Sequence, residues 1–183
     1  MIQVNFRNFE YGKDLDRLYK YMMKEDNQVL FSHGFQMNSL QLFERWISEK
    51  FARNEYHDFF MIEDGRGNTI GFTFSYEFYS YDAHCKFTLC LFEEYVNQGY
   101  GAVAAVKMMD YLFCKYPLRR VYVSVFDYNR SSIDNNLKGG FEEIAVLPEY
   151  RFWGGEYYSL HIMAMTRDKF YSEHKRMISI IRK

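Results

Sequence analysis

The chain has 183 residues, the size of one ordinary domain that can bury a substantial core. Its 23 Lys and Arg residues and 24 Asp and Glu residues give a formal net charge of −1, which excludes a protein that binds nucleic acid mainly through charge. No segment has the roughly 20 apolar residues of a membrane span, no signal-peptide pattern is present, and 3 cysteines without framework spacing indicate reduced thiols. We therefore expect one cytoplasmic domain over residues 1–183, with no membrane or nucleic-acid partner.

The first half of the chain predicts a strand, two helices and three strands. Residues 2–7 alternate weakly in polarity, as a strand does. Residues 14–24 and 38–51 carry apolar side chains at helical spacing, the second stretch after a plausible start at Asn38 and Ser39. The three strands are predicted at 59–62, 69–79 and 84–92, with a hairpin turn at 63–68 between the first two.

The second half predicts a helix at 101–116 that carries an apolar stripe and stops at Pro117. The elements expected after it are a strand at 120–126, a short helix at 131–138, strands at 142–147 and 157–165, and a helical tail at 168–183. This order is typical of an α/β fold with a mixed sheet, in which the strands on either side of helix 101–116 run parallel.

Two glycines, Gly99 and Gly101, stand at the start of the predicted helix 101–116. Backbone N–H groups there lack partners and the helix dipole favours an anion, so this pattern is typical of a phosphate site. A P-loop is excluded because no Gly-Lys-Ser/Thr follows. Residues 99–104 fit the G-x-G-x-x-A dinucleotide fingerprint, and Asp127 ends the next strand. However, six mostly polar residues separate strand from glycine, which leaves an NAD(P)-dependent oxidoreductase as a remote alternative.

Three segments resemble the GNAT superfamily of N-acetyltransferases. Residues 95–109, YVNQGYGAVAAVKMM, resemble its coenzyme A pyrophosphate loop, whose usual pattern is Q/R-x-x-G-x-G/A. Residues 129–132 with Gly140 and Phe141 resemble its N-x-x-S/A … G-F element, and residues 150–170 resemble the last hairpin of its ribosomal-protein and polyamine acetyltransferase branch. The resemblance covers 68–170 and implies the GNAT (acyl-CoA N-acyltransferase) fold, a mixed, mostly antiparallel sheet flanked by helices and with splayed central strands.

The resemblance also implies a reaction: direct transfer of an acetyl group from acetyl-CoA to the primary amine of a small molecule or a peptide N-terminus. Backbone groups of the strand before the loop would bind the pantetheine arm, and the loop would bind the pyrophosphate. Asn129 would join the second half of the site, with a helix N-cap as its alternative role, and Ser132 would lie near the coenzyme sulfur. The implied cofactor-binding residues are Leu89, Cys90, Leu91, Asn97, Gln98, Gly99, Tyr100, Gly101, Ala102, Asn129 and Ser132.

Three positions depart from the family pattern. Val96 stands where Gln or Arg is usual, Lys86 where a glutamate is frequent, and Asn136 where many relatives have a tyrosine that acts as general acid. Ser132 can still donate a hydrogen bond to the sulfur, so it is the candidate for stabilising the leaving thiolate. The general base is unassigned, with water or one of Glu77, Glu149 and Glu156 as candidates. The departures leave open an acyl-CoA-binding module that transfers nothing.

Aromatic side chains are expected to line the acceptor cleft, because ring faces attract a cationic amine. Packing in the sheet or in a homodimer interface is the alternative. The residues concerned are Tyr76, Tyr79, Tyr81, Tyr150, Trp153, Tyr157 and Tyr158. His84 and Cys85 would point to opposite sheet faces, so no metal site is expected. The basic, partly apolar tail is expected to be a frayed terminus, with docking on the domain, on a second subunit or on an acidic partner as the alternatives.

Overall fold

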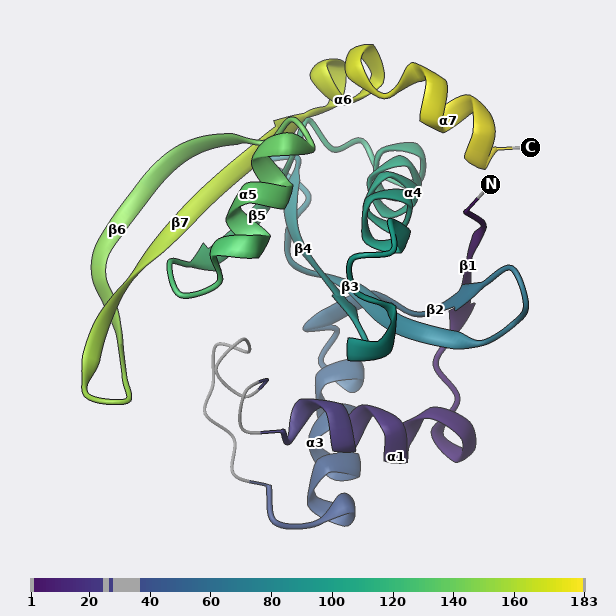
Figure 1. Ribbon diagram of the computed structural model, residues 1–183, viewed down its shortest axis with the longest axis vertical. Coiled ribbons are helices and arrows are strands. Elements are labelled where there is room, and N and C mark those ends of the chain that lie inside the picture. Colours follow the sequence, from purple (N-terminus) through teal and green to yellow (C-terminus); the bar gives the residue numbers. More distant parts are fainter. Residues whose placement is uncertain (1, 25–26, 28–36, 183) are drawn as a thin grey trace.

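A computed structural model describes residues 2–24, 27 and 37–182. Seven strands form one sheet in the order β1-β2-β3-β4-β5-β7-β6, with helices on both faces (Figure 1). The strands are β1 (Val4–Asn8), β2 (Tyr56–Asp64), β3 (Thr69–Tyr79), β4 (His84–Leu91), β5 (Arg120–Phe126), β6 (Glu142–Trp153) and β7 (Glu156–Thr166). The helices are α1 (Tyr11–Met22), α3 (Leu40–Ala52), the short 3-10 turn η1 (Glu93–Tyr95), α4 (Tyr100–Lys115), α5 (Arg130–Lys138), α6 (Arg167–Glu173) and α7 (Lys175–Ile181). The expected order of elements is confirmed.

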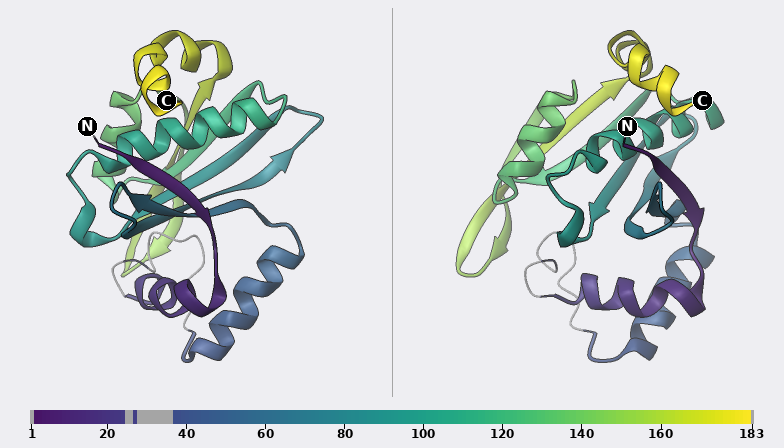
Figure 2. Two further views of the ribbon diagram at one scale, coloured as in Figure 1. Left: turned by 90° about the vertical axis from the view of Figure 1, so that its right-hand side faces the viewer. Right: turned by 45° about the vertical axis from the view of Figure 1, so that its right-hand side comes forward.

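The two faces of the sheet bury different cores. Helices α1 and α3 cover one face through an aromatic cluster that includes Phe43, Phe72 and Phe74. Helix α4 crosses the other face (Figure 2), where its Met108 and Phe113 pack in one cluster with apolar residues of β4, β5, β7 and the later helices. The GNAT fold expected from the resemblance, mostly antiparallel and flanked by helices, is confirmed.

Strands β4 and β5 separate soon after they start. They are the one parallel pair of the sheet, and three positions of β4, from His84 to Lys86, pair with Arg120 to Tyr122. By contrast, β5 pairs with β7 along seven positions. From Phe87 onward β4 therefore pairs with no described strand on its β5 side, which confirms the expected splay.

Strand β6 is longer than predicted, because the prediction ended it before Pro148. Proline lacks an N–H donor and is tolerated mainly in edge strands and at bulges. Here β6 is the edge strand, and a register shift between Leu147 and Arg151 absorbs the proline, with Glu149 in a left-handed conformation (φ 50°). The β6–β7 hairpin thus continues well past Leu147 and extends away from the rest of the sheet (Figure 1).

The C-terminal tail is not frayed in its described part. Helices α6 and α7 pack over α4, where Phe170 and Ile178 are buried. The Arg182 guanidinium donates to both carboxylate oxygens of Asp110 in α4, at 2.6 and 2.8 Å. The prediction was wrong because the apolar residues of the tail are spaced so that they form one helical face that needs cover. No helix of the described residues is long and apolar enough to cross a membrane.

The start of α1 is held by a buried ion pair that makes stability depend on pH. Arg7 donates to both carboxylate oxygens of Asp14, at 2.7 and 2.8 Å, and Asp14 is 3% exposed. Burial alone would raise the pKa of Asp14, but the hydrogen bonds from Arg7 and from the Glu10 N–H outweigh it and lower that pKa.

Asp14→Asn is expected to lower the free energy of unfolding by about 2 kcal/mol at pH 7, through loss of charge-assisted hydrogen bonds. Because the folded-state pKa is lowered, the carboxylate stabilises the fold above its unfolded pKa of about 3.9 and loses that effect as pH falls through the folded value. Urea unfolding at a series of pH values checks this. The gap between wild type and variant should close in acid, and a gap that is constant down to pH 2 would contradict the assignment.

Candidate active site

The turn from β4 into α4 presents unpaired backbone donors. After β4, η1 and two left-handed residues, Asn97 (φ 59°) and Gly99 (φ 84°), reverse the chain. The first hydrogen bond of α4 runs from the Val103 N–H to the Gly99 carbonyl, at 3.5 Å. The N–H groups of residues 100–102 precede it and have no helical acceptor. Together with the positive end of the helix dipole, they make this turn suited to an anion.

The two glycines of this turn are needed for different reasons. Gly99 adopts a backbone conformation that favours glycine, and a Cβ there would lie 2.7 Å from Ile2 Cδ1. Gly101 has ordinary helical geometry, and a Cβ there would meet only Leu91 Cδ1, at a normal 3.6 Å. The fold itself therefore has room for a side chain at position 101. Open space above this backbone fits a ligand group that must come close to it.

The side chains around the turn are only partly available. The Gln98 Nε2 donates to the Glu94 carbonyl of η1 at 2.6 Å. Because the side-chain amide is used in this way, the predicted contact of Gln98 with a ligand would depend on its backbone N–H. Val96 is 45% exposed and offers no hydrogen-bonding side chain. Any anion at this turn would therefore be bound mainly by main-chain donors.

Free backbone groups along β4 continue from the turn into the opening between β4 and β5. The Phe92 N–H donates to the Ile70 carbonyl of the β3 segment at 2.9 Å. Because successive residues of a strand point their N–H and C=O groups to opposite sides, the regular β3–β4 register directs Cys90 toward β3 as well. Leu89 and Leu91 then direct theirs into the opening. Of the three predicted strand residues, these two have a free main chain.

Helix α5 begins beside the same opening. Asn129 caps it, since its Oδ1 accepts the Ser132 N–H at 3.2 Å, so the N-cap role is confirmed and a ligand role stays a prediction. The Asn136 Nδ2 donates to the Ser132 carbonyl at 2.9 Å and to its Oγ at 3.4 Å. Because the Ser132 Oγ accepts this hydrogen bond, its own proton is left to be donated elsewhere.

The three candidate bases lie in different surroundings. Glu77 of β3 contacts Lys86 of β4 at 2.8 Å, so it is close to the opening but already paired with a cation. Glu149 lies exposed at the β6 bulge, and Glu156, near the hairpin tip, accepts the Tyr158 hydroxyl at 3.0 Å. None of the three is a buried carboxylate facing the Ser132 helix, and the base stays unassigned.

A cluster of tyrosine side chains lies near Cys90 on the face covered by α1, and the sequence did not reveal it. Tyr21, Tyr56 and Tyr76 belong to the same cluster as Cys90. Burial raises the pKa of Cys90 to about 12 and that of Tyr76 to about 12, so the thiol and the phenol are uncharged. Cys90 therefore is no nucleophile. In the sequence, Tyr21 and Tyr56 look like ordinary apolar positions of a helix and a strand. Only the packing of α1 and β2 against the rest of the sheet brings them close to β4.

The seven predicted aromatics do not form one wall. Tyr76 is packed against Phe74 (5.8 Å between ring centres), whereas Tyr81 is fully exposed. Tyr150 and Tyr157 lie on the β6–β7 hairpin and are 59% and 65% exposed. Tyr76 thus lies in the core beside β4, Tyr81 lies in the exposed turn between β3 and β4, and Tyr150 and Tyr157 lie on the hairpin, which leaves the plane of the sheet.

Known proteins with the same features are found by sequence and by structure. Residues 3–142 match the family model of the acetyltransferase (GNAT) domain. The chain is 23% identical over 129 residues to the SPβ prophage-derived uncharacterized N-acetyltransferase YokL of Bacillus subtilis, covering 70% of this chain and 72% of that protein.

Two solved structures show the likeness in fold. Spermidine N-acetyltransferase from Vibrio cholerae in complex with CoA and spermine has a TM-score of 0.82 at 22% identity, covering 92% of this chain and 98% of that one. The dodecameric structure of spermidine N-acetyltransferase from Vibrio cholerae in an intermediate state has a TM-score of 0.77 at 20% identity, covering 95% and 98%.

The family match covers most of the chain, including the β4 edge, the glycine turn and α5. Acetyl-CoA is the acetyl donor of this family, and the free donors over residues 100–102 and the open main chain of Leu89 and Leu91 fit a ligand with a phosphate end and an amide-bearing arm. The protein belongs to the GNAT family of acetyltransferases, which move the acetyl group of acetyl-CoA to an amine.

Proposed function

We propose that the protein transfers an acetyl group directly from acetyl-CoA to the primary amine of a small molecule or a peptide N-terminus. One observation carries this proposal: the unpaired edge of β4 leads directly into the anion-binding turn of α4. An extended ligand with a pyrophosphate at one end can use both at once. The main chains of Leu89 and Leu91 would bind its amide groups as an added strand does, and residues 100–102 would bind its phosphates.

The chemistry of the transfer assigns a role to Ser132. An acceptor ammonium with a pKa near 10 must lose a proton before its nitrogen can attack the thioester carbonyl. When the C–S bond breaks, the thiolate leaves with the electron pair and is stabilised by a hydrogen-bond donor. The Ser132 hydroxyl, whose oxygen already accepts from Asn136, is that donor in this proposal. Positioning of the two reactants supplies much of the rate.

The relatives support placing the protein in the ribosomal-protein and polyamine branch of the family. Ser132 occupies the position at which that branch carries serine, and the fold matches spermidine N-acetyltransferases along nearly the whole chain. Three unpaired cysteines, Cys85, Cys90 and Cys114, support a cytoplasmic location. Exposed apolar residues along β6, such as Ile144 (49%) and Phe152 (60%), support a homodimer.

The proposal is tested by acetyl-CoA binding and by turnover. Saturating acetyl-CoA should raise the melting temperature, and thiol release should appear with at least one acceptor in a panel of amino acids, polyamines, aminoglycosides and peptides. Absence of any shift would reject acetyl-CoA binding. Binding without turnover on the whole panel would favour an inert acyl-CoA module, which the departures at Val96, Lys86 and Asn136 suggest as the second candidate.

Val96→Arg is expected to keep acetyl-CoA binding or to strengthen it by up to about tenfold. The side chain at position 96 is 45% exposed beside the anion-binding turn, and a guanidinium there adds a charge-assisted hydrogen bond. Isothermal titration with acetyl-CoA measures the change, and Val96→Leu is the control that adds size without charge. Weaker binding in the arginine variant alone would mean that the register assigned to this turn is wrong.

Ser132→Ala is expected to lower kcat by about tenfold and to leave KM for acetyl-CoA unchanged, because the hydroxyl acts on the leaving thiolate. Steady-state thiol release measures both constants. The control is Ser131→Ala, since Ser131 is the exposed neighbour in the same turn. An equal loss in both variants would show that the helix start was disturbed and that the hydroxyl has no separate role.

A further inference from the structure

A group of polar and charged side chains lies on the α1-covered face of the sheet where β4 and β5 diverge. Cys85 and Val121 are in register and both enter the core under α4, so the residues that flank them point to the opposite face. The ring contact between His84 and Tyr122, 5.3 Å between centres, agrees with this placement. The residues are His84 and Lys86 of β4 and Arg120 and Tyr122 of β5.

The Arg120 side chain makes no hydrogen bond or ion pair with the described residues, although its backbone N–H donates to the Ala83 carbonyl at 3.3 Å. Its Nε is buried and without a partner, and its guanidinium lies 6.0 Å from the centre of the Tyr122 ring. The Glu142 carboxylate is paired with Lys169 at 2.6 Å. Its pKa is lowered mainly by Lys169 and to a smaller extent by the charge of Arg120. A buried N–H without an acceptor costs free energy, so this position favours an anion supplied from outside the described chain.

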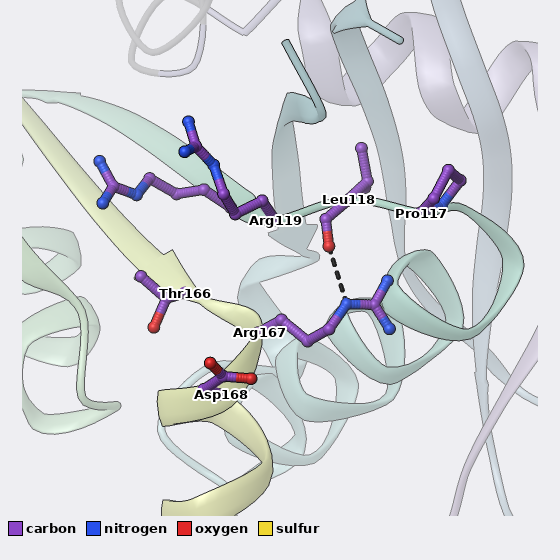
Figure 3. A pocket seen from close by; sticks show the side chains of 7 residues that line it. Pro117, Leu118, Arg119, Thr166, Arg167 and Asp168 are labelled. Atoms are coloured by element: carbon purple, nitrogen blue, oxygen red, sulfur yellow. Dashed lines mark hydrogen bonds between the residues drawn. The ribbon is translucent and has the colours of Figure 1, made fainter. Parts of the chain in front are cut away.

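Arg119 extends the positive charge to the rim of the sheet. It lines a shallow hollow of about 610 Å³ together with His84 and Tyr122. It also lines an adjoining hollow of about 410 Å³, in which Arg167 turns away from it and donates to the Leu118 carbonyl at 2.8 Å (Figure 3). Arg167 thus serves the fold, whereas Arg119 is exposed and forms no ion pair with a described residue.

Besides Glu142, three carboxylates of the described residues lie near this charge and oppose it only weakly. One of them, Asp168, lies exposed in the adjoining hollow. Glu77 pairs with Lys86 at 2.8 Å, but the two side chains are 47% and 25% exposed, and such pairs contribute little and exchange partners readily. Asp82 lies exposed in the rim hollow. A ligand acid can displace Glu77 from Lys86 and still find Arg119 and Arg120 without partners.

The spacing along β4 relates this charge to the reaction site. The free main chain of β4 reaches Leu89, and Lys86 precedes it by three residues, or about 10 Å at the rise of a strand. His84, which pairs with Arg120 in the β4–β5 register, precedes Leu89 by five residues, or about 17 Å. Beside this stretch of β4, the uncharged aromatic cluster that includes Tyr76 offers apolar surface.

We propose, on the basis of the proposed function, that the acceptor is an amine that carries an acidic group, a carboxylate or a phosphate, roughly 10–17 Å from its nitrogen. Arg119 and Arg120 bind the acid while the amine lies at the β4 opening. A polyamine would place a second ammonium against two guanidinium groups, which is unfavourable. The proposal therefore separates this protein in substrate from the spermidine N-acetyltransferases that it resembles in fold.

Matched acceptors test the proposal. We would compare kcat/KM for 8-aminooctanoate, octylamine and 1,8-diaminooctane, with a second set of twelve carbons. An acid that exceeds its amine and diamine by about tenfold, the value of one net ion pair, supports the proposal. Preference for the diamines overturns it while acetyl transfer itself stands. An aminoalkyl phosphate of equal length then tells whether carboxylate or phosphate is preferred.

Product binding decides the matter independently of turnover. Titration of 8-acetamidooctanoate and its twelve-carbon analogue into protein saturated with CoA should show binding that weakens at least about tenfold in the double variant Arg119→Gln/Arg120→Gln. Arg176→Gln, an exposed arginine of α7, should bind like wild type. Equal binding in the double variant, or none to the wild type, overturns the proposal. Failure of CoA itself to bind removes the proposed function instead.

Discussion

Replacing Gly101 by valine is expected to raise the dissociation constant for acetyl-CoA by at least about 100-fold, which is about 2.7 kcal/mol. The new side chain occupies the space above the backbone donors of residues 100–102 and keeps the phosphates from reaching them. The protein itself should not suffer, because a Cβ at this position meets only Leu91 Cδ1, at 3.6 Å. Isothermal titration measures the affinity, and thermal unfolding of the free protein measures the fold.

Gly12→Val is the matched control for this experiment. Gly12 is the second residue of α1, as Gly101 is the second residue of α4, and a Cβ there would meet nothing within 4 Å. The control should change neither affinity nor melting temperature. Wild-type affinity in Gly101→Val would show that no ligand comes close to this turn, and a matching loss of stability would show that the effect is structural.

Gly71→Ala is expected to remove about 4 kcal/mol of unfolding free energy, among the largest effects that a single substitution produces. A Cβ on Gly71 of β3 would lie 2.1 Å from the Cys90 carbonyl oxygen and 2.9 Å from the Leu91 Cα. Both are backbone atoms of β4, so they cannot move without opening the ladder between the two strands. Urea denaturation measures the loss.

A glycine of the neighbouring hairpin provides the comparison for Gly71. Gly67, in the turn between β2 and β3, has φ 81°, and a Cβ there would meet nothing within 4 Å. Gly67→Ala should cost only the strain of its left-handed conformation, about 1 kcal/mol. If Gly71→Ala cost no more than Gly67→Ala, the contact between β3 and β4 would be looser than the structure indicates.

Local sequence patterns predicted the order of elements, the parallel β4–β5 pair and the glycine turn. Each of these depends on residues that are neighbours along the chain: a break in apolar spacing at Pro117, alternation over 120–126, or two glycines at a helix start. The predicted ends of β3 and β5 agree with the structure for the same reason.

The errors concern residues whose environment is set by distant parts of the chain. Pro148 ended the predicted strand because its own chemistry opposes a ladder, yet its place on a sheet edge removes the objection. The sequence also could not show that the N–H and C=O groups of Cys90 point toward β3 and not toward a ligand. That direction depends on the β3–β4 register, which no local pattern reveals. The positions of Tyr21 near Cys90 and of Arg120 beside His84 likewise depend on how α1 and β5 pack against β4.

The alternation along β4 has a consequence for hydrogen exchange. In the free protein the Cys90 amide is protected by β3, whereas the amides of Leu89 and Leu91 face the opening and exchange with solvent. A ligand arm that pairs with those two residues would protect them in turn. Bound acetyl-CoA would thus make the protection continuous along this part of β4. It would also extend the contact between the two halves of the sheet beyond the three positions at which β4 pairs with β5.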